Sequence, residues 1–233
     1  MAGHCHAAGI VADGGTATTV RTDASGRQTV AIAPPVYGVS HNTYTSFNVG
    51  AAGATLDNTG INARTIVNEV TGTSPSLIAG AINVAGPRAN VILANPNGIT
   101  VNGGSFVNTG HVALSTGLVS FNDVLVAPGV YQRNVVLDVQ GGSIEIAGAG
   151  LAGTLIGLDL IAKTVSVRAP ITNDFSSPTA YVRVIAGGGK ASLNTALSPD
   201  DTVTLEAAHC RYRQQETKPG ALILAETSLA SVS

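Results

Sequence analysis

The sequence predicts an all-β fold, a right-handed parallel β-helix (β-solenoid) with an N-terminal capping segment. Charged residues make up 11% of the chain and aromatic residues 4%, which is low for a globular domain with a bulky core. Short β-rich runs recur without amphipathic helical segments between them, which excludes an ordinary βαβ fold. Hairpin signals are scarce at the ends of these runs. Asn and Gly occur there instead, and both tolerate the left-handed conformations that a coil needs at its corners.

Residues 1–36 form the predicted cap. This segment is rich in Gly and Thr, and it ends at Pro34-Pro35, which cannot continue a central strand. The end of a solenoid exposes unpaired backbone groups that invite aggregation, and a cap would cover them. No comparable cap is visible at the C-terminal end, where Ala221–Ala225 still reads as a strand. The chain is therefore expected to be truncated from a longer helix.

Residues 37–233 carry the repeated strands of the predicted β-helix. Most runs alternate aliphatic side chains with Asn, Thr or Ser, which predicts one buried face and one face in water. At roughly 20 to 25 residues per coil, these residues would make about eight to ten coils. Stacked corners would place Asn above Asn, so that side-chain amides bond from coil to coil. Representative runs are Ala81–Val84, Asn90–Ala94, Gly98–Val101, His111–Leu114, Ser143–Ile146, Thr164–Val167 and Tyr181–Ile185.

Charge and hydropathy argue against several classes of function. The 12 basic and 14 acidic residues give a formal net charge of −2, and no Lys/Arg run could follow a phosphate backbone, so no nucleic-acid partner is expected. Gly, Pro or polar residues interrupt every apolar run before about 18 residues, so no membrane span is expected. The only two cysteines, Cys5 and Cys210, are too few for a disulfide scaffold, and whether they pair stays open.

The stretch Asn95-Pro96-Asn97-Gly98 reads by itself as a β-turn, because Pro fixes φ at the second position and Asn tolerates a left-handed third position. Its surroundings are more specific: Ala94–Thr100 is followed, after two residues, by Gly103–Thr109. Together these residues resemble the haemagglutination-activity, or two-partner-secretion (TPS), domain at the start of filamentous-haemagglutinin-like and haemolysin-like exoproteins.

Three further stretches resemble the same family in the same order, so that the resemblance spans roughly residues 9–190. Gly38–Asn42 with Phe47–Val49 is similar to its early motif, Ile66–Val70 to its next strand, and Leu158–Ala162 to a later coil.

The sequence also departs from the family pattern at two places. Leu56–Asn62 stands where related domains often have a second Asn-Pro-Asn turn. Val101 and Gly104 occupy the positions of a cysteine pair that is common in haemolysin-type members. The second departure disfavours a haemolysin subtype.

The resemblance implies that the chain is the N-terminal secretion domain of a large exoprotein, found at the cell surface or outside a Gram-negative bacterium after crossing the periplasm. Its partner would be a cognate outer-membrane β-barrel transporter of the TpsB type, which carries periplasmic receptor domains. Folding outside the cell would then nucleate the β-helix of the longer passenger. Host cells or neighbouring bacteria would be contacted through that downstream passenger.

Ten residues are candidates for these roles. The turn could be read by the transporter or could nucleate a tight corner, and the early motif could be a recognition or capping element or an ordinary polar contact. Asn68 and Glu69 are expected to satisfy buried backbone groups where coils stack. The candidates are Asn95, Pro96, Asn97, Gly98, Ile99, Ser40, His41 and Asn42 for transporter recognition or folding nucleation, and Asn68 and Glu69 for structure.

No catalytic residue, metal site or cofactor is expected. The cluster His4-Cys5-His6 lacks the geometry of a defended metal site. A β-helix enzyme acting on polysaccharides would need convergent carboxylates, but those of this chain are dispersed. They are Asp123, Asp138, Glu145, Asp159 and Asp174. An adhesive module that binds host glycan or protein through its Ser/Thr/Asn-rich faces is the main alternative, and a carbohydrate-active enzyme is the third.

Overall fold

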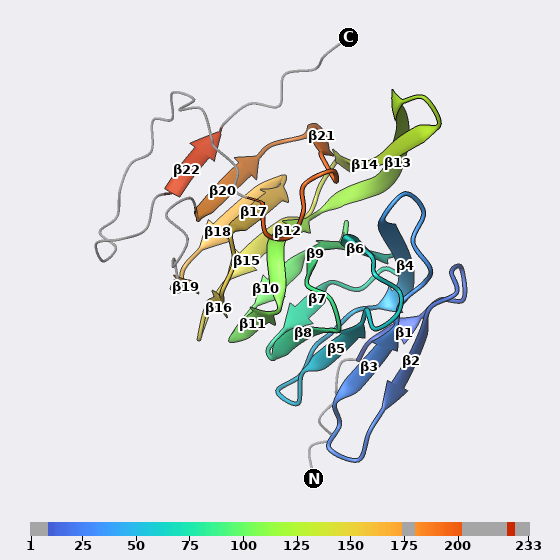
Figure 1. Ribbon diagram of the computed structural model, residues 1–233. Helices are drawn as coiled ribbons and strands as arrows, with labels where there is room; N and C mark the ends of the chain where they lie inside the picture. The colour runs from blue at the N-terminus through green and yellow to red at the C-terminus, as the bar shows by residue number, and fades with distance from the viewer. Residues whose placement is uncertain (1–8, 174–179, 202–222, 227–233) are drawn as a thin grey trace.

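The computed structural model describes residues 9–173, 180–201 and 223–226, and every regular element within them is a β-strand. Most of the strands wind around a common axis as a parallel β-helix of about six turns (Figure 1). The predicted all-β parallel β-helix is therefore confirmed. The predicted number of eight to ten coils is wrong, because a long antiparallel hairpin takes up residues that the prediction had assigned to coils.

Sheet A is the largest sheet and has eight strands in the order β1-β4-β6-β9-β12-β17-β20-β22. All neighbours from β4 onwards pair in parallel, each strand lying one turn further along the chain. The strands are β1 (Val11–Ala12), β4 (Val39–Ser46), β6 (Thr65–Val70), β9 (Ala89–Ala94), β12 (Thr109–Ser115), β17 (Gly157–Ala162), β20 (Tyr181–Ala186) and β22 (Ile223–Glu226).

Sheets B and C complete the turns: from β6 onwards the chain passes from sheet A to sheet C to sheet B and back, whereas the first turn, from β4 to β6, has a strand in sheet B alone. Sheet B has the order β19-β16-β11-β8-β5-β3-β2 and sheet C the order β18-β15-β10-β7. The strands of sheet B are β2 (Thr19–Thr22), β3 (Gln28–Ala31), β5 (Ala54–Asp57), β8 (Ala81–Ala85), β11 (Gly104–Val107), β16 (Leu151–Gly153) and β19 (Ile171–Asn173). Those of sheet C are β7 (Ser76–Ile78), β10 (Ile99–Val101), β15 (Ser143–Ile146) and β18 (Thr164–Val167).

The interior of the β-helix is an apolar core to which all three sheets contribute. Strands in sheets B and C alternate buried aliphatic side chains with more exposed ones, as the period of two in the sequence predicts. Ile66, Leu93 and Leu114 of sheet A meet Leu56 and Ile82 of sheet B in this interior. Parallel stacking thus places similar side chains in rows along the axis.

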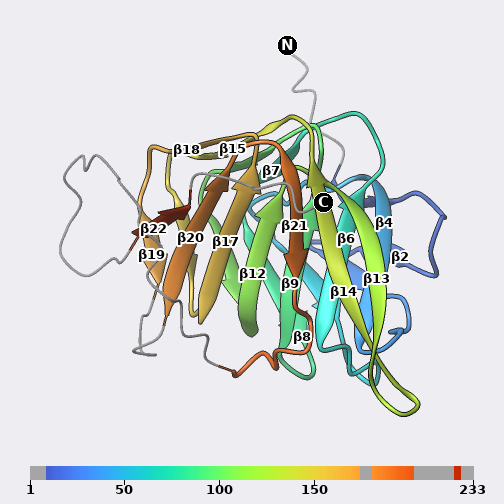
Figure 2. The same cartoon turned by 90° about the horizontal axis from the view of Figure 1, so that it is seen from above.

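A fourth sheet, sheet D, packs on the outer face of sheet A, outside the β-helix (Figure 2). It is antiparallel and consists of β13 (Gly117–Ala127), β14 (Val130–Val139) and β21 (Gly189–Leu193). Its apolar residues, among them Leu137, pack against Val67, Ile92 and Ile161 of sheet A in a second core. The expectation that each strand has one wet face is therefore wrong for sheet A, where β9 and β17 are buried at every position.

The hairpin β13–β14 is the excursion that reduces the number of turns. From Val112 on β12 to its partner Leu158 on β17 the chain runs 46 residues, from 112 to 158, whereas Val91 and Val112 are 21 residues apart. The turn between the two strands contains Pro128-Gly129, with Gly129 at φ 75°. This hairpin was not predicted from the sequence, although Pro-Gly is a recognised turn signal.

The N-terminal segment pairs antiparallel with the first strands of two sheets. β1 pairs with β4 at the edge of sheet A, and β2 pairs with β3 at the edge of sheet B. β3 itself pairs in parallel with β5, so residues 28–31 already belong to the stacked part of sheet B. The division into a cap of residues 1–36 and a helix of residues 37–233 stays a prediction.

Candidate functional site

The Asn95–Ile99 turn forms the corner between β9 of sheet A and β10 of sheet C. The Gly98 N–H donates to the Asn95 carbonyl at 3.1 Å and closes the turn. Gly98 has φ 118°, a conformation that L side chains rarely adopt, which explains glycine at this position. Ile99, the first residue of β10, is buried in the inner core. The motif is thus a tight corner that directs the chain into the next sheet.

Asn95 is fully buried and joins two successive coils. Its Nδ2 donates to the Ser74 carbonyl at 3.0 Å and to the Ser76 hydroxyl at 2.9 Å, both in the preceding coil. Its Oδ1 accepts from the Asn97 N–H at 3.0 Å and from Asn97 Nδ2 at 2.9 Å. An amide that makes four such bonds fixes both the shape of its own turn and the stacking on the coil before it.

Asn97 and Pro96 form the outer part of the corner. Asn97 is exposed, yet its Nδ2 donates to the Gly72 carbonyl of the preceding coil at 2.8 Å. Pro96 is half-buried, and its carbonyl lies so close to Gly142 that a Cβ on that glycine would approach within 2.6 Å. The corner is therefore packed against coils on both sides, and of its polar side chains only that of Asn97 reaches solvent.

Ser40 and Asn42 point into the interior from β4, where both are fully buried. The Ser40 hydroxyl donates to the Ala33 carbonyl at 2.6 Å. Asn42 Oδ1 accepts from the Thr18 hydroxyl and from the Ala33 N–H, each at 2.8 Å. These bonds tie the N-terminal segment, which contains Thr18 and Ala33, to the first strand of the parallel ladder.

Asn42 and Asn68 are partners in the register of β4 and β6 and form a short amide ladder. Asn42 Nδ2 donates to the Val67 carbonyl at 3.1 Å, and Asn68 Nδ2 donates to the Ile92 carbonyl at 3.2 Å. Asn68 Oδ1 accepts from the Tyr44 hydroxyl at 2.9 Å. Burial raises the pKa of Tyr44 well above its ordinary value, so the hydroxyl stays protonated and remains a donor.

His41 and Glu69 lie on the opposite, outer face of the same two strands. His41 Nε2 is 2.7 Å from Glu69 Oε2, and the His41 ring packs edge-to-face on Phe121 of β13 at 4.9 Å between centroids. The partner of the Glu69 carboxylate is thus a side chain beneath the hairpin, and not a buried backbone group.

The structure therefore divides the ten candidate residues into separate groups. Ser40, Asn42 and Asn68 line the interior, and His41 pairs with Glu69 on the outer face. The turn follows directly on Ala94, which lies beside Glu69 in register, whereas Ser40 lies beside Ile66, toward the other end of these strands.

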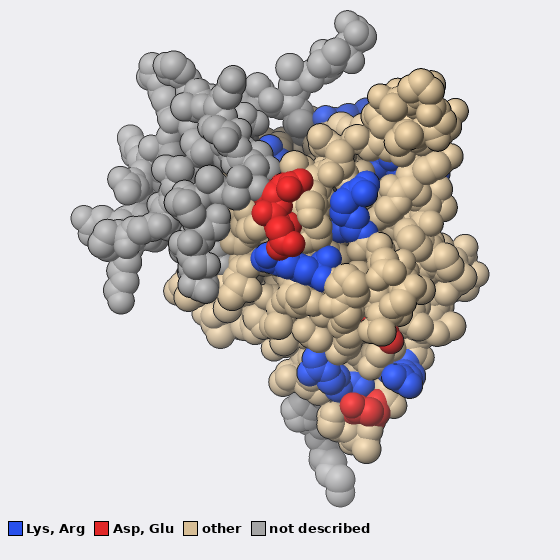
Figure 3. Space-filling model, viewed as in Figure 1, with Lys and Arg blue, Asp and Glu red and all other residues tan. Residues whose placement is uncertain are grey.

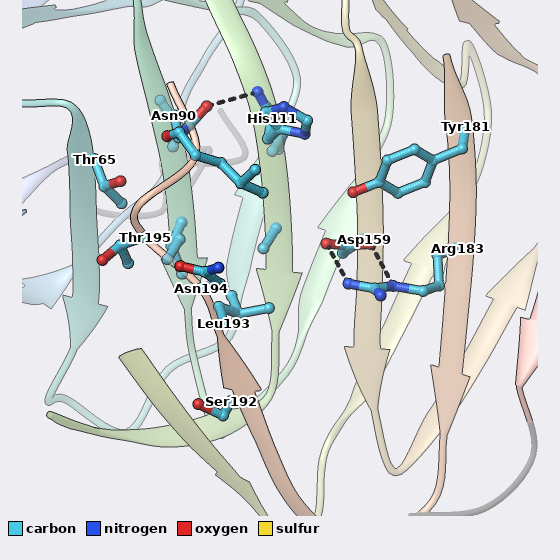
Figure 4. A pocket seen from close by; sticks show the side chains of 15 residues that line it. Thr65, Asn90, His111, Asp159, Tyr181, Arg183, Ser192, Leu193, Asn194 and Thr195 are labelled. Carbon is cyan, nitrogen blue, oxygen red and sulfur yellow. Dashed lines mark hydrogen bonds and ion pairs between the residues drawn. The ribbon is translucent and has the colours of Figure 1, made fainter. Parts of the chain in front are cut away.

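A pocket of about 330 Å³ opens on the outer face of sheet A beside β21 (Figure 4). Register places His111 and Tyr181 on either side of Gly157, and places Arg183 beside Asp159 one row further on. Arg183 Nε and Nη2 donate to the Asp159 carboxylate at 2.8 and 3.0 Å. Burial raises the pKa of Asp159, and Arg183 only partly opposes this.

The pairing of Asp159 with Arg183 was not predicted from the sequence. The two residues are 24 residues apart, which is one coil, and both stand between aliphatic residues in similar runs. The signal in the sequence was a basic residue that stands one coil length after an acidic residue, which predicts an ion pair between neighbouring strands. Three other carboxylates of the described residues also meet arginines: Asp123 meets Arg133 at 2.7 Å, Glu145 meets Arg168 at 3.5 Å, and Asp200 meets Arg88 at 2.6 Å. Asp174 lies outside the described residues.

Metal-capable groups do not gather within the described ranges: no three His, Cys, Asp or Glu side chains there could hold an ion together. His4, Cys5, His6 and Cys210 all lie outside those ranges. In the same part of the chain there is no helix that is long and apolar enough to cross a membrane.

A family model and a solved structure both match most of the chain. The family model, described as TPS secretion domain, matches residues 8–224. The crystal structure of a filamentous hemagglutinin secretion domain superposes with a TM-score of 0.70 at 32% identity, covering 88% of this chain and 71% of that one.

Three relatives illustrate the similarity in sequence. The chain is 38% identical over 192 residues to the tRNA nuclease CdiA of Escherichia coli O6:K15:H31 (strain 536 / UPEC), covering 72% of this chain and 6% of that protein. It is 34% identical to the filamentous hemagglutinin of Bordetella pertussis, covering 79% and 5%, and 34% identical to a hemolysin of Serratia marcescens, covering 83% and 13%. The chain thus spans between 5% and 13% of the length of these three relatives.

Proposed function

Because this chain belongs to the TPS secretion domain family, we propose that it directs a larger exoprotein to a cognate outer-membrane transporter of the TpsB type and nucleates β-helix folding outside the cell. The periplasmic receptor domains of the transporter would engage the chain before it folds. The product would reach the cell surface or the surroundings of a Gram-negative bacterium. The domain takes part in export as a binding and folding module, and we assign no catalytic step to it.

The burial of Asn95 is the observation that supports this order of events. In the folded domain its amide is enclosed between coils, so a receptor can contact it only while the corner is open. We infer that Asn95 and Asn97 serve twice: first as exposed amides in the extended chain, and then as the hydrogen bonds that close the corner. Ser40 and Asn42 would act as a capping element, because their bonds join the N-terminal segment to the first parallel strand.

Folding outside the cell would draw the chain outward without nucleotide hydrolysis. A solenoid grows by nearest-neighbour stacking, so each emerging coil buries apolar surface on the coil before it. The corner at Asn95 joins its own coil to the preceding one, which would make it an early step in this growth. Leaving a buried partner of Asn95 without its hydrogen bond would cost about 1–3 kcal/mol.

Export and refolding of Asn95→Ala and Asn97→Ala test the proposal. Each variant is fused to a reporter passenger and co-expressed with the transporter, and the purified chain is refolded from urea. Asn95→Ala is expected to slow refolding and to reduce export, because buried groups lose their partner. Asn97→Ala is expected to reduce export with a smaller effect on refolding, since its side chain is exposed.

Asn122→Ala on the exposed part of β13 is the matched control and should leave both measurements unchanged. Full export of both turn variants would remove the motif from the mechanism. Export that follows the refolding rate in every variant would leave the turn with a folding role alone.

A second candidate function is adhesion to a glycan, and the pocket at Asp159 is the observation that favours it. The pocket is lined by Tyr181 and by the carboxylate–guanidinium pair of Asp159 and Arg183, and these groups offer hydrogen-bond acceptors and donors that suit a hydroxyl-rich ligand (Figure 4). Binding of the isolated domain to a glycan array, abolished by Tyr181→Ala, would support this role. An array without a signal would remove it.

A further inference from the structure

The tip of the β13–β14 hairpin, residues Val124–Tyr131, presents a concentration of apolar side chains to solvent. The exposed fractions are 38% for Val124, 56% for Leu125, 53% for Val126, 53% for Val130 and 45% for Tyr131. Figure 1 shows that the hairpin projects beyond the body of the β-helix at this end. Single exposed apolar residues are ordinary, but a contiguous apolar patch on a projecting element marks an interaction site.

Apolar side chains point to both faces of the tip. Consecutive residues in a strand face opposite sides, so Val124 and Leu125 project in opposite directions. Leu125 faces the same side as its partner Tyr131, whereas Val124 pairs with Gln132 on the other side. A groove on a protein would cover one of these faces. A fluid apolar medium covers both.

Charge is absent from the tip and balanced at its base. Residues 124–132 contain no Lys, Arg, Asp or Glu. In Figure 3 the tip is the tan, uncharged projection at the upper right. The first charged residues are Asp123 and Arg133, which neutralise each other through two bonds of 2.7 Å. An uncharged end above a neutral ion pair matches the hydrocarbon and the zwitterionic headgroups of a phospholipid layer.

Tyr131, the last residue of the tip, and Tyr37 lie next to this ion pair. Tyr37 and Tyr131 stack with 5.3 Å between ring centroids, and the Arg133 guanidinium lies over the Tyr37 ring at 5.8 Å. Tyrosine rings are enriched where a bilayer meets water, and arginine extends toward headgroups. The sequence of aliphatic tip, tyrosine pair and ion pair therefore follows the order of environments in a membrane interface.

We propose that the hairpin tip inserts into the surface of a phospholipid bilayer and docks the folded domain there. The strand portion Val124–Ala127 extends about 10 Å at roughly 3.4 Å per residue, which suits insertion to the headgroup and acyl boundary. It is far shorter than the 9–11 residues that a membrane-spanning strand needs. The tip is thus a shallow anchor. This role is separate from transporter recognition by the Asn95 turn.

Binding should depend little on lipid charge. The chain has a net charge of −2, and the cation at the hairpin base is already paired with Asp123. Attraction to anionic lipid is therefore not expected to contribute, in contrast to basic amphipathic segments. We expect association with phosphatidylcholine vesicles that persists in high salt.

The chain contains no tryptophan, so a single introduced one reports on the tip alone. Leu125→Trp is mixed with phosphatidylcholine vesicles whose acyl chains carry bromine. The expected result is a blue shift and quenching of the Trp emission. Val107→Trp is the matched control, since Val107 is 45% exposed on β11 of sheet B, away from the hairpin. It should show neither change.

Val130→Asp tests whether the apolar tip carries the binding. A carboxylate at the tip should lower the fraction that sediments with vesicles by about tenfold or more, because charge is costly below the headgroups. Val107→Asp should leave that fraction unchanged, and thermal unfolding should show both variants to be folded. Emission of Leu125→Trp that does not respond to vesicles, or sedimentation of Val130→Asp equal to that of the parent, overturns the proposal. Self-association that Val130→Asp abolishes, without any response to vesicles, also overturns it and assigns the tip to a second copy of the chain.

Discussion

Sheets A and B of this β-helix are both built mainly from parallel strands, but they lie in different environments. In sheet B, β5 and β8 alternate between buried and half-buried positions. In sheet A, β9 and β17 are buried throughout. The difference arises because sheet D packs on the outer face of sheet A and leaves sheet B open. Parallel strands covered on both faces become continuously apolar, and residues 91–94 of β9 have this character.

The comparison shows that one wall of the solenoid stabilises two cores. Ile161 points outward to sheet D, while Leu160 beside it points into the interior. The antiparallel layer is thus part of the packed structure of the domain. The far end of its hairpin, beyond Asp123 and Arg133, is exposed on both strands except at the half-buried Gln132.

Breaking the outer core should have the largest effect. Leu137→Asp places an unpaired carboxylate at a fully buried position of β14, and we expect a loss of more than about 4 kcal/mol, a large part of the stability of a typical domain. Val130→Asp, in the exposed tip of the same strand, should change the free energy of unfolding by no more than about 0.5 kcal/mol. Urea denaturation followed by circular dichroism measures both. A loss below about 1 kcal/mol for Leu137→Asp would show that sheet D is only loosely attached.

Removing a buried side chain from each face of β17 should have an effect of intermediate size and compares the two cores directly. Ile161→Ala and Leu160→Ala each remove a fully buried side chain, and each should cost about 2–5 kcal/mol. Val107→Ala in sheet B should cost less than about 0.5 kcal/mol, because its side chain is largely in water. The same denaturation experiment applies. A cost for Ile161→Ala close to that of Val107→Ala would refute the equivalence of the two cores.

The smallest expected effect is on the pH dependence of stability, and it involves two carboxylates. Asp159 lies on the covered face of sheet A, and Asp13 lies in the exposed N-terminal segment. Burial raises the folded-state pKa of Asp159, so the folded protein binds more protons than the unfolded chain, and this contribution to stability falls as pH rises from about 4. Burial also acts on Asp13, but hydrogen bonds from Thr43, Gly15 and Thr71 outweigh it and lower its pKa. The stability from Asp13 is therefore present above about pH 4 and is lost on acidification.

Unfolding curves between about pH 2 and 7 should separate these two contributions. Asp13→Asn is expected to flatten the loss of stability in acid, because the group that binds the extra proton on unfolding is gone. Asp159→Asn is expected to steepen that loss, because the folded state no longer gains stability in acid by binding a proton at Asp159. Curves of the two variants that shift in the same direction would contradict the assigned signs.

Local sequence patterns predicted the parallel coils because burial in a solenoid repeats at short range. The alternation in Ala81–Val84 and Ser143–Ile146 reports directly which side chains face the interior. The turn at Asn95-Pro96-Asn97-Gly98 could be predicted from its own residues, because Pro and Gly restrict or permit particular backbone angles. Hydrogen bonding of side-chain amides from coil to coil was also predicted; Asn95 makes such bonds at a corner, whereas the stacked pair Asn42 and Asn68 makes them inside the coils.

The candidate site was only partly predictable. Nothing near Ser40 or Asn42 in the sequence shows that their partners are Ala33 and Thr18. Asp159 and Arg183 are neighbours only because one coil happens to occupy 24 residues at that point. The hairpin was missed because it interrupts an otherwise regular series of short runs.

The sequence by itself determined the parallel β-helix, its corners and the resemblance that identifies the secretion family, since each depends on residues close together in the chain. Only the tertiary structure decided that sheet A would be covered on both faces, that His41 would meet Phe121 beneath a hairpin, and that an apolar tip would be left exposed. Backbone angles and strand alternation are local properties. The packing of one sheet on another depends on residues that only the completed coils bring together.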